Sequence, residues 1–159
     1  MNFSRALVTL GVISGLALVT SSAMAAAQSI EASVDLSDGA VTQTTWTPVT
    51  GLTTNLADGA KLGQFDIQLN DATSLEMTQT SPAKIEDAFS LNLDGGTGAN
   101  NESILAIPVI KGQKHSVKQN MLQLSDLQNA VQIELQAVGS NVMKPGHYTA
   151  NFDITSYAG

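Results

Sequence analysis

Apolar and polar residues alternate along most of the chain after residue 28. In a β-strand successive side chains point to opposite faces of the sheet, so such alternation predicts strands with one buried and one exposed face. The pattern predicts strands at 40–46, 62–69, 75–80, 89–93, 104–110, 131–137 and 148–156. Two short segments, 84–88 and 125–129, are candidates for a helical turn, and neither has the length of an ordinary helix.

Turn signals stand between the predicted strands, at 50–51, 58–59, 70–71, 94–98, 111–112 and 144–146. Short alternating strands joined by such turns predict an all-β, antiparallel sandwich.

Two segments depart from the simple pattern. Residues 104–110 are apolar on both faces and include Pro108, which predicts an edge or a bulge at that position. The glycine-rich segment 95–101 predicts a flexible loop.

The first residues have the form of an export signal. Arg5 precedes an apolar run over 6–19, and small residues at 23–25 match an A-x-A cleavage site. A membrane anchor is the alternative, but the apolar run is shorter than the roughly 20 residues that span a bilayer. We therefore expect cleavage after Ala25, with Ala27 as the next candidate, and export of the remainder as one domain.

Charge and cysteine content restrict the function classes. The arginine of the signal is the only one, so the mature chain has 7 − 1 = 6 lysines against 14 carboxylates and a formal charge of 6 − 14 = −8. An acidic chain without a basic stripe repels phosphate, so nucleic acid is not an expected partner, and anionic membrane surfaces are disfavoured. The chain has no cysteine, so the domain folds without a disulfide and has no thiolate nucleophile or cysteine metal site.

The segment directly after the signal, residues 29–37, is a predicted strand of unusual placement. Polar residues fill one of its faces, and the apolar face consists of Ile30, Ala32, Val34 and Leu36. A turn dipeptide at 38–39 separates it from the next predicted strand. It is either the ordinary first strand of the domain or an arm that can swing away. The strand at 148–156 lies near the C-terminus, and we expect no further strand after it.

A strand is missing from the predicted sandwich. With 89–93 and 104–110 counted together, about six strands follow residue 39, against seven in an immunoglobulin-type sandwich. A sandwich that lacks a strand exposes an apolar slot and a row of unpaired backbone groups unless another strand fills it. The spare arm and the missing strand are complementary. Copies that fill one another head to tail do not form a closed ring, and they yield a fibre.

Three segments together resemble a known family. They are the alternating arm at 30–36, the opening at 45–48 with 61–67, and the closing strand at 144–154, which has the pattern x-P-G-x-Y-x-A-x-(aromatic)-x-I. The chain resembles chaperone–usher pilins, which join by strand addition, and within them the cysteine-free subunits of thin or capsule-like atypical fimbriae. The resemblance extends over nearly the whole mature chain. The disulfide typical of type 1 and P pilins is absent.

The resemblance implies an all-β, incomplete immunoglobulin-like antiparallel sandwich, completed by a donor strand from a neighbouring subunit or a chaperone. It implies a signal peptide at 1–25, a donor-strand extension at 26–38 and an incomplete pilin domain at 39–159. The donor side chains would be those of the arm's apolar face, Ile30, Ala32, Val34 and Leu36. The acceptor groove edge and the chaperone contact would be Tyr148, Ala150, Phe152, Ile154 and Gly159.

The same resemblance implies the partners. A periplasmic chaperone would supply the missing strand and grip the terminal carboxylate, and an outer-membrane usher would then exchange it for the arm of the next copy. The product would be a homopolymer, a fimbria on the bacterial cell surface that supports cell adhesion. A host receptor is a further possible partner.

Candidate catalytic residues are sparse. His115 lies beside lysines in a predicted loop, and His147 lies at a strand entrance. The adjacent acids Glu86 and Asp87 fit a solvated turn. Nothing in the sequence selects two carboxylates as a glycosidase pair, and neither a calcium-loop spacing nor a G-x-S-x-G motif is present. We therefore expect no enzyme, no cofactor and no metal.

Two rival functions remain. Trp46 is either a core residue or a sugar-stacking platform, and the second interpretation would suit a free-standing exported lectin-like binding module. The third hypothesis is a fimbrial tip adhesin. The arm argues against the tip, because a tip subunit has nothing ahead of it to donate to. Whether residues 29–37 pair within their own domain or in another copy distinguishes these functions.

Overall fold

The computed structural model describes residues 29–37, 41–80 and 87–158. Several predicted features lie outside the described residues. They are the signal peptide, the start of the extension, Gly159 and most of the helical candidate at 84–88. None of the described helices is long and apolar enough to cross a membrane. The elements are β1 (Ser29–Ser37), β2 (Val41–Pro48), β3 (Asn55–Leu56), β4 (Lys61–Leu69), β5 (Ala72–Gln79), β6 (Phe89–Leu93), the 3₁₀ helix η1 (Asn100–Glu102), β7 (Ser103–Ile110), β8 (Gln113–Lys114), β9 (Met121–Leu124), β10 (Ala130–Ala137), β11 (Asn141–Val142) and β12 (His147–Ala158).

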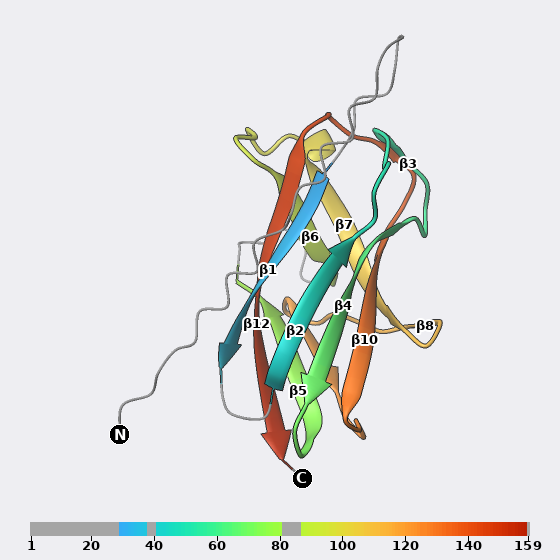
Figure 1. Ribbon diagram of the computed structural model, residues 1–159. Coiled ribbons are helices and arrows are strands. Elements are labelled where there is room, and N and C mark those ends of the chain that lie inside the picture. Colours follow the sequence, from blue (N-terminus) through green and yellow to red (C-terminus); the bar gives the residue numbers. More distant parts are fainter. Residues whose placement is uncertain (1–28, 38–40, 81–86, 159) are drawn as a thin grey trace.

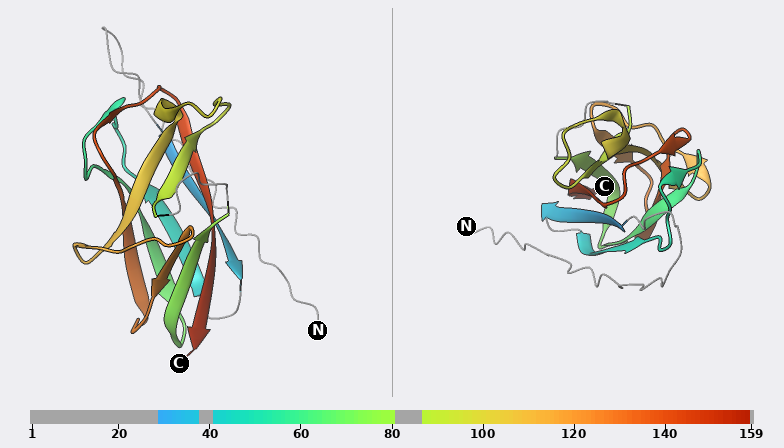
Figure 2. Two further views of the ribbon diagram at one scale, coloured as in Figure 1. Left: turned by 180° about the vertical axis from the view of Figure 1, so that it is seen from behind. Right: turned by 90° about the horizontal axis from the view of Figure 1, so that it is seen from above.

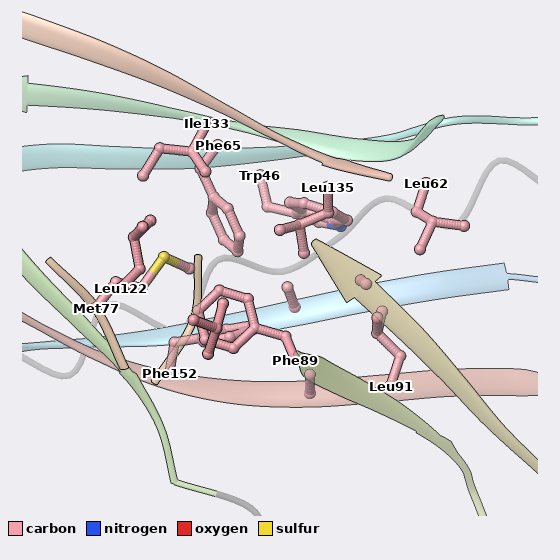
Figure 3. Packing of buried hydrophobic residues seen from close by; sticks show 14 of the residues in the cluster. Trp46, Leu62, Phe65, Met77, Phe89, Leu91, Leu122, Ile133, Leu135 and Phe152 are labelled. Atoms are coloured by element: carbon pink, nitrogen blue, oxygen red, sulfur yellow. The ribbon is translucent and has the colours of Figure 1, made fainter. Parts of the chain in front are cut away.

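The strands form two layers that face each other across an apolar core (Figure 1). Hydrogen bonding runs in the order β2-β4-β10-β7-β6-β12-β5-β9, and β3 and β11 pair separately. The path turns back on itself, so that β2, β4 and β10 lie opposite β12, β5 and β9 (Figure 3). Among the described residues every ladder is antiparallel except the one between β1 and β12. The predicted all-β antiparallel sandwich is therefore confirmed.

Aromatic rings join the two layers at the centre of the core. Phe65 of β4 meets Phe152 of β12 edge to face, with ring centroids 5.5 Å apart, and Phe89 of β6 meets the same ring at 5.0 Å. Trp46 of β2 packs against Phe65 at 4.6 Å. Edge-to-face geometry places the positive ring edge against the negative face, which adds to the burial of large apolar surfaces. These rings join the two layers around β12 (Figure 3).

Glycine is required where Trp46 lies over β4. A Cβ built on Gly63 would clash with the Trp46 ring and approach the carbonyl oxygen of Thr47 to 2.9 Å. The indole therefore lies directly on the backbone of β4. Only a residue without a side chain permits this close approach.

Pro108 is accommodated without a bulge. The register between β7 and β10 runs unbroken from Ala106 to Val109, and β6 ends opposite Ala106. The Pro108 carbonyl accepts a hydrogen bond from the His115 backbone N–H at 2.9 Å. The missing N–H of Pro108 therefore faces away from β10. On that side β6 has ended and the two-residue strand β8 follows, so Pro108 lies between the two partners of β7, and the expectation of a bulge is wrong.

The helical candidate at 125–129 is also wrong. Asp126 has a positive φ of 56°, a left-handed conformation that a right-handed helix cannot contain. The Leu127 N–H donates to the Thr73 carbonyl at 2.9 Å instead of to a helical partner. The segment is a loop held against the start of β5.

Candidate functional site

The last strand, β12, presents a continuous apolar row to the core. Its inward residues are at most 1% exposed, and they are Tyr148, Ala150, Phe152 and Ile154. The intervening residues point outward and are partly or fully exposed. The period-2 alternation of the sequence thus correctly predicts which face of this strand is buried. Whether this row acts as an acceptor groove depends on what lies at the two edges of β12.

The two edges of β12 have different neighbours. Tyr148 pairs with Leu93 of β6 and also with Ile30 of β1, while Phe152 pairs with Gln79 of β5 and also with Val34 of β1. A strand residue has one neighbour on each side, so β5 and β6 share one edge and β1 occupies the other. Without β1 that second edge would carry unpaired backbone N–H and C=O groups beside an apolar row.

The chain's own β1 fills this open edge. It runs parallel to β12 in unbroken register from the Ser29–His147 pair to the Ser37–Thr155 pair. Figure 1 shows β1 between β12 and β2, and Figure 2 shows its place beside β12 from behind. The described chain therefore pairs the predicted arm within its own domain. Completion by a strand from another molecule stays a prediction.

The structure partly describes how the predicted donor residues lie in the groove. Ile30 is 2% exposed and Ala32 is 7% exposed, so both side chains belong to the core. The backbone register places Val34 beside Phe152 and Leu36 beside Ile154, although those two side chains fall outside the described part. On the far side of β1, the Trp46 indole N–H donates to the Ile30 carbonyl at 3.4 Å. The terminal Gly159, predicted as the chaperone contact, lies outside the described residues.

A buried carboxylate joins the loop after β6 to Lys144, which lies shortly before β12. Glu102 is 4% exposed, and its Oε2 accepts the backbone N–H groups of Thr97 at 2.6 Å, Gly98 at 2.8 Å and Ala99 at 3.1 Å. Its Oε1 accepts the Lys144 ammonium at 2.6 Å. Successive backbone N–H groups form a concavity that suits an anion. The glycine-rich segment, predicted as a flexible loop, is therefore ordered around this carboxylate over 97–99.

The same cluster positions the first groove residue. The Tyr148 hydroxyl donates toward the Lys144 carbonyl at 2.7 Å, with the Asn101 carbonyl at 3.2 Å. The Lys144 N–H also donates to the Asn101 carbonyl at 2.9 Å. Tyr148 is thus held at its hydroxyl by two loops while its ring is buried in the core. This arrangement fixes where β12 begins.

Charge pairing sets the protonation of this cluster. The Lys144 ammonium, aided by the backbone and hydroxyl donors of the loop, lowers the pKa of Glu102 to about 2. Burial, together with the nearby Glu102 charge, raises the pKa of Tyr148 above its ordinary value. Both groups therefore keep one protonation state at neutral pH: Glu102 is charged and Tyr148 is neutral.

The other candidate residues have structural surroundings. Trp46 is 7% exposed and packs against Phe65, so its core interpretation is correct and the sugar-platform interpretation is wrong. His147 Nε2 lies 3.8 Å from Asp94 Oδ2 at the surface. Within the described ranges no three histidine, aspartate or glutamate side chains are grouped as a metal site.

Two solved structures share this immunoglobulin-like sandwich. One is the crystal structure of HdaB, the minor tip subunit of the Escherichia coli Hda pilus, with 16% identity, a TM-score of 0.61, and coverage of 76% of this chain and 85% of that chain. The other comes from AAF fimbriae of enteroaggregative Escherichia coli, studied for fibronectin binding and biofilm formation, with 14% identity, a TM-score of 0.54, and coverage of 72% and 96%.

Sequence comparison adds no relative to these structures, because neither a family model nor a curated protein sequence matches the chain. The structural likeness nevertheless confirms, at the level of the fold, the predicted resemblance to fimbrial subunits. The fold is the immunoglobulin-like sandwich that these fimbrial proteins also have.

The Glu102–Lys144–Tyr148 cluster was missed by sequence reasoning. Its members are separated by up to 46 positions, and Glu102 lies in a segment rich in glycine and asparagine. The available signal was a lone carboxylate within a glycine-rich loop, since such loops expose the N–H groups that an anion needs.

Proposed function

We propose that the chain is a structural subunit of a bacterial surface fimbria, and that it polymerises by donor-strand exchange rather than acting as an enzyme. The observation that supports this most strongly is the second edge of β12, where β1, the first strand of the described chain, is the partner. The fold shared with fimbrial subunits is consistent with it.

Exchange requires that β1 can leave while the rest of the domain stays folded. The opposite edge of β12 keeps its antiparallel partners β5 and β6, and the aromatic contacts of Phe152 with Phe65 and Phe89 do not involve β1. In the polymer, the Ile30, Ala32, Val34 and Leu36 face of one copy takes the place of β1 in the next. Such contacts are head to tail, so they propagate as a fibre.

The remaining parts of the proposal follow from this assembly. Residues 1–25 are a signal peptide, residues 26–38 are the donor extension and residues 39–159 are the acceptor domain. A periplasmic chaperone occupies the β12 edge and contacts Gly159 before an outer-membrane usher exchanges it for the next arm. The fibre stands on the cell surface and supports adhesion to a host receptor.

A free-standing exported binding module is the second candidate. The pairing of β1 within its own domain favours it, because an ordinary first strand would pair in this way. The two candidates differ in whether β1 is replaceable.

The test uses residues 26–159, residues 39–159, and residues 39–159 with segment 29–37 fused to the C-terminus through a flexible linker. We expect the first to convert from monomer to polymers, the second to aggregate, and the third to be a stable monomer by size-exclusion chromatography and thermal melting. A synthetic peptide of residues 29–37 should rescue the second protein. The same peptide carrying Ile30→Asp is the matched control and should not rescue it.

The opposite result would favour the binding module. In that case residues 26–159 would stay a monomer at every concentration, and the fused strand would not restore the domain that lacks its arm. The peptide would also fail to bind, because β1 would then fold only as a part of its own chain.

A further inference from the structure

A hollow lies on the outward face of the layer formed by β12, β5 and β9. It is open to solvent and has a volume of about 310 Å³, at the lower end of the volumes typical of small-molecule sites. The fully buried Leu75 and the nearly buried Leu124 line it from the core side, and Tyr157 lines it near the C-terminal end of β12. Figure 1 shows that end of β12 running beside β5.

Tyr157 is the exception among the aromatic residues. It is 46% exposed, whereas every other aromatic side chain in the described ranges is buried. The register between β12 and β5 shifts directly after Tyr157, and such irregularities redirect a side chain. An exposed ring beside a hollow offers an apolar face to a ligand.

The polar groups of the hollow are already held in place. The Tyr157 hydroxyl donates to Glu76 Oε2 at 2.9 Å, and the Gln123 amide donates to Glu76 Oε1 at 3.0 Å. The strands β12, β5 and β9 thus contribute one hydrogen-bonded group of side chains, and Ser74 and Ser125 also line the hollow. The site therefore needs little ordering before it binds a ligand.

We propose that this hollow binds one ring of a neutral sugar. A pyranose has a C–H face that can lie on the Tyr157 ring and hydroxyl groups that both donate and accept. The Glu76 carboxylate offers about four acceptor positions, of which two are used by Tyr157 and Gln123. The Gln123 carbonyl and the two serine hydroxyls supply further partners at the same site.

The negative charge of Glu76 favours neutral sugars over anionic sugars in the hollow. Glu76 is a carboxylate, and an anionic sugar placed against it would meet a like charge. A basic peptide side chain is the competing ligand, since it could pair with Glu76 and stack on Tyr157. We favour the neutral sugar, because the other polar side chains that line the hollow are uncharged, and a pyranose can use them together with the free acceptor positions of Glu76.

The hollow does not depend on how the groove is filled. It lies on the outward face of the layer, whereas β1 occupies the edge of β12 that faces away from β5. Monomer and polymer therefore present it equally. Failure of donor-strand exchange would leave this site intact, and failure of sugar binding would leave the exchange proposal intact.

The first experiment uses the two tyrosines of the chain as reporters. Residues 26–159 are labelled with 3-fluorotyrosine, and Tyr157→Phe assigns the two ¹⁹F resonances. The probes are the methyl glycosides of glucose, galactose and N-acetylglucosamine, together with N-acetylneuraminic acid and N-acetyl-arginine amide. We expect at least one neutral glycoside to shift the Tyr157 resonance saturably, with a Kd on the order of 1 mM, and to leave the Tyr148 resonance unmoved.

Variants then locate the site by saturation-transfer NMR of the sugar. Tyr157→Ala should abolish the signal, and Tyr157→Phe and Glu76→Gln should each weaken binding several-fold. Val142→Ala, at a residue 70% exposed outside the hollow, is the matched control and should bind normally. Thermal melts of each variant check that the fold is retained.

Three results would each overturn the proposal. They are the absence of a Tyr157 shift with all neutral glycosides, a shift caused only by the arginine derivative or the anionic sugar, and sugar binding that survives Tyr157→Ala in a folded protein.

Discussion

The two edges of β12 differ in almost every respect, although they belong to one strand. One edge carries antiparallel partners, β6 and β5, that come from the middle of the chain. The other carries a parallel partner, β1, from the start of the described chain. The first edge is filled by strands from within the sandwich, whereas the second is filled by the first strand of the described chain.

This difference shows how one strand can serve both stability and exchange. The aromatic contacts of Phe152 and the hydroxyl anchor of Tyr148 involve no residue of β1, so they remain when β1 leaves. The β1 edge depends on the Ile30 and Ala32 side chains, the β12 ladder and one indole hydrogen bond. Substitutions on the two sides of β12 should therefore have separable effects.

The largest effect is expected at the first edge. Phe152→Ala removes the ring that meets both Phe65 and Phe89, and it should lower the free energy of unfolding by about 3–5 kcal/mol whichever strand fills the groove. Urea unfolding of residues 26–159 and of the C-terminally fused protein measures it. Gln132→Ala, at an exposed position of β10, should change stability by less than about 0.5 kcal/mol. A loss confined to one of the two proteins would contradict the independence of this edge.

The next effect concerns the anchor at the start of β12. The folded-state pKa of Glu102 is lowered from 4.5 to about 2, so its stabilisation is fully present above about pH 4.5 and is lost as the pH falls toward 2. Glu102→Gln should be less stable than the natural chain at neutral pH, and the difference should shrink across that range. Denaturant unfolding at a series of pH values measures it.

The control for this titration is Glu134→Gln, because Glu134 pairs with Lys61 at 3.5 Å in a more exposed setting. The difference in unfolding free energy between this variant and the natural chain should be small. A Glu102→Gln difference that stayed constant from neutral pH to pH 2 would show that the carboxylate is not charged and paired in the folded domain.

A smaller effect is expected from Gly63→Ala. The new methyl group would displace the Trp46 ring, at a cost of about 1–3 kcal/mol from overpacking. Because Trp46 also borders β1, the variant should release the arm more readily than its global stability suggests. Hydrogen exchange of the β1 amides, compared with those of β10, measures this. Thr47→Ala, an exposed neighbour, is the control, and equal acceleration in β1 and β10 would refute the local effect.

The smallest effect on the retention of β1 is expected from Trp46→Phe. The substitution keeps an aromatic ring beside Phe65 but removes the N–H that donates to the Ile30 carbonyl at 3.4 Å. One such bond contributes about 0.5–1.5 kcal/mol, and its length places it at the lower end. Polymerisation of residues 26–159, followed by light scattering, should be faster in this variant. An unchanged rate would mean that the indole does not restrain β1.

The sequence predicted the long strands well because their burial follows a period of two. The strands predicted at 62–69, 89–93, 104–110, 131–137 and 148–156 agree with the observed elements to within a few residues. Apart from 104–110, which is apolar on both faces, these segments have one face toward the core and one toward solvent, so their sequences alternate between apolar and polar residues. The inward residues of β12 could be named for the same reason.

The short strands β3, β8, β9 and β11 could not be predicted. They have two to four residues, too few for alternation to be distinguished from chance, and they form because turns elsewhere bring their backbones together. The sequence also could not predict whether β1 pairs parallel or antiparallel with β12. An alternating strand offers the same apolar face whether it runs parallel or antiparallel to its neighbour.

The central claim is that the groove of β12 accepts an exchangeable strand, and one cysteine pair tests it most directly. Ser33 and Asn151 are paired in the observed register. Ser33 is the central residue of segment 30–36, and Asn151 is the central residue of segment 148–154. If the arm of another copy runs antiparallel to β12 and pairs these two segments over their whole length, the two central residues still face each other. The chain has no natural cysteine to interfere.

The measurement is oxidation of Ser33→Cys/Asn151→Cys in residues 26–159 before and after incubation at high concentration, followed by denaturing, non-reducing electrophoresis. The account predicts a cross-linked monomer at first and a ladder of covalent multimers after incubation, with neither single-cysteine variant giving more than a dimer. Cross-linked monomer alone, at all concentrations and times, would contradict it.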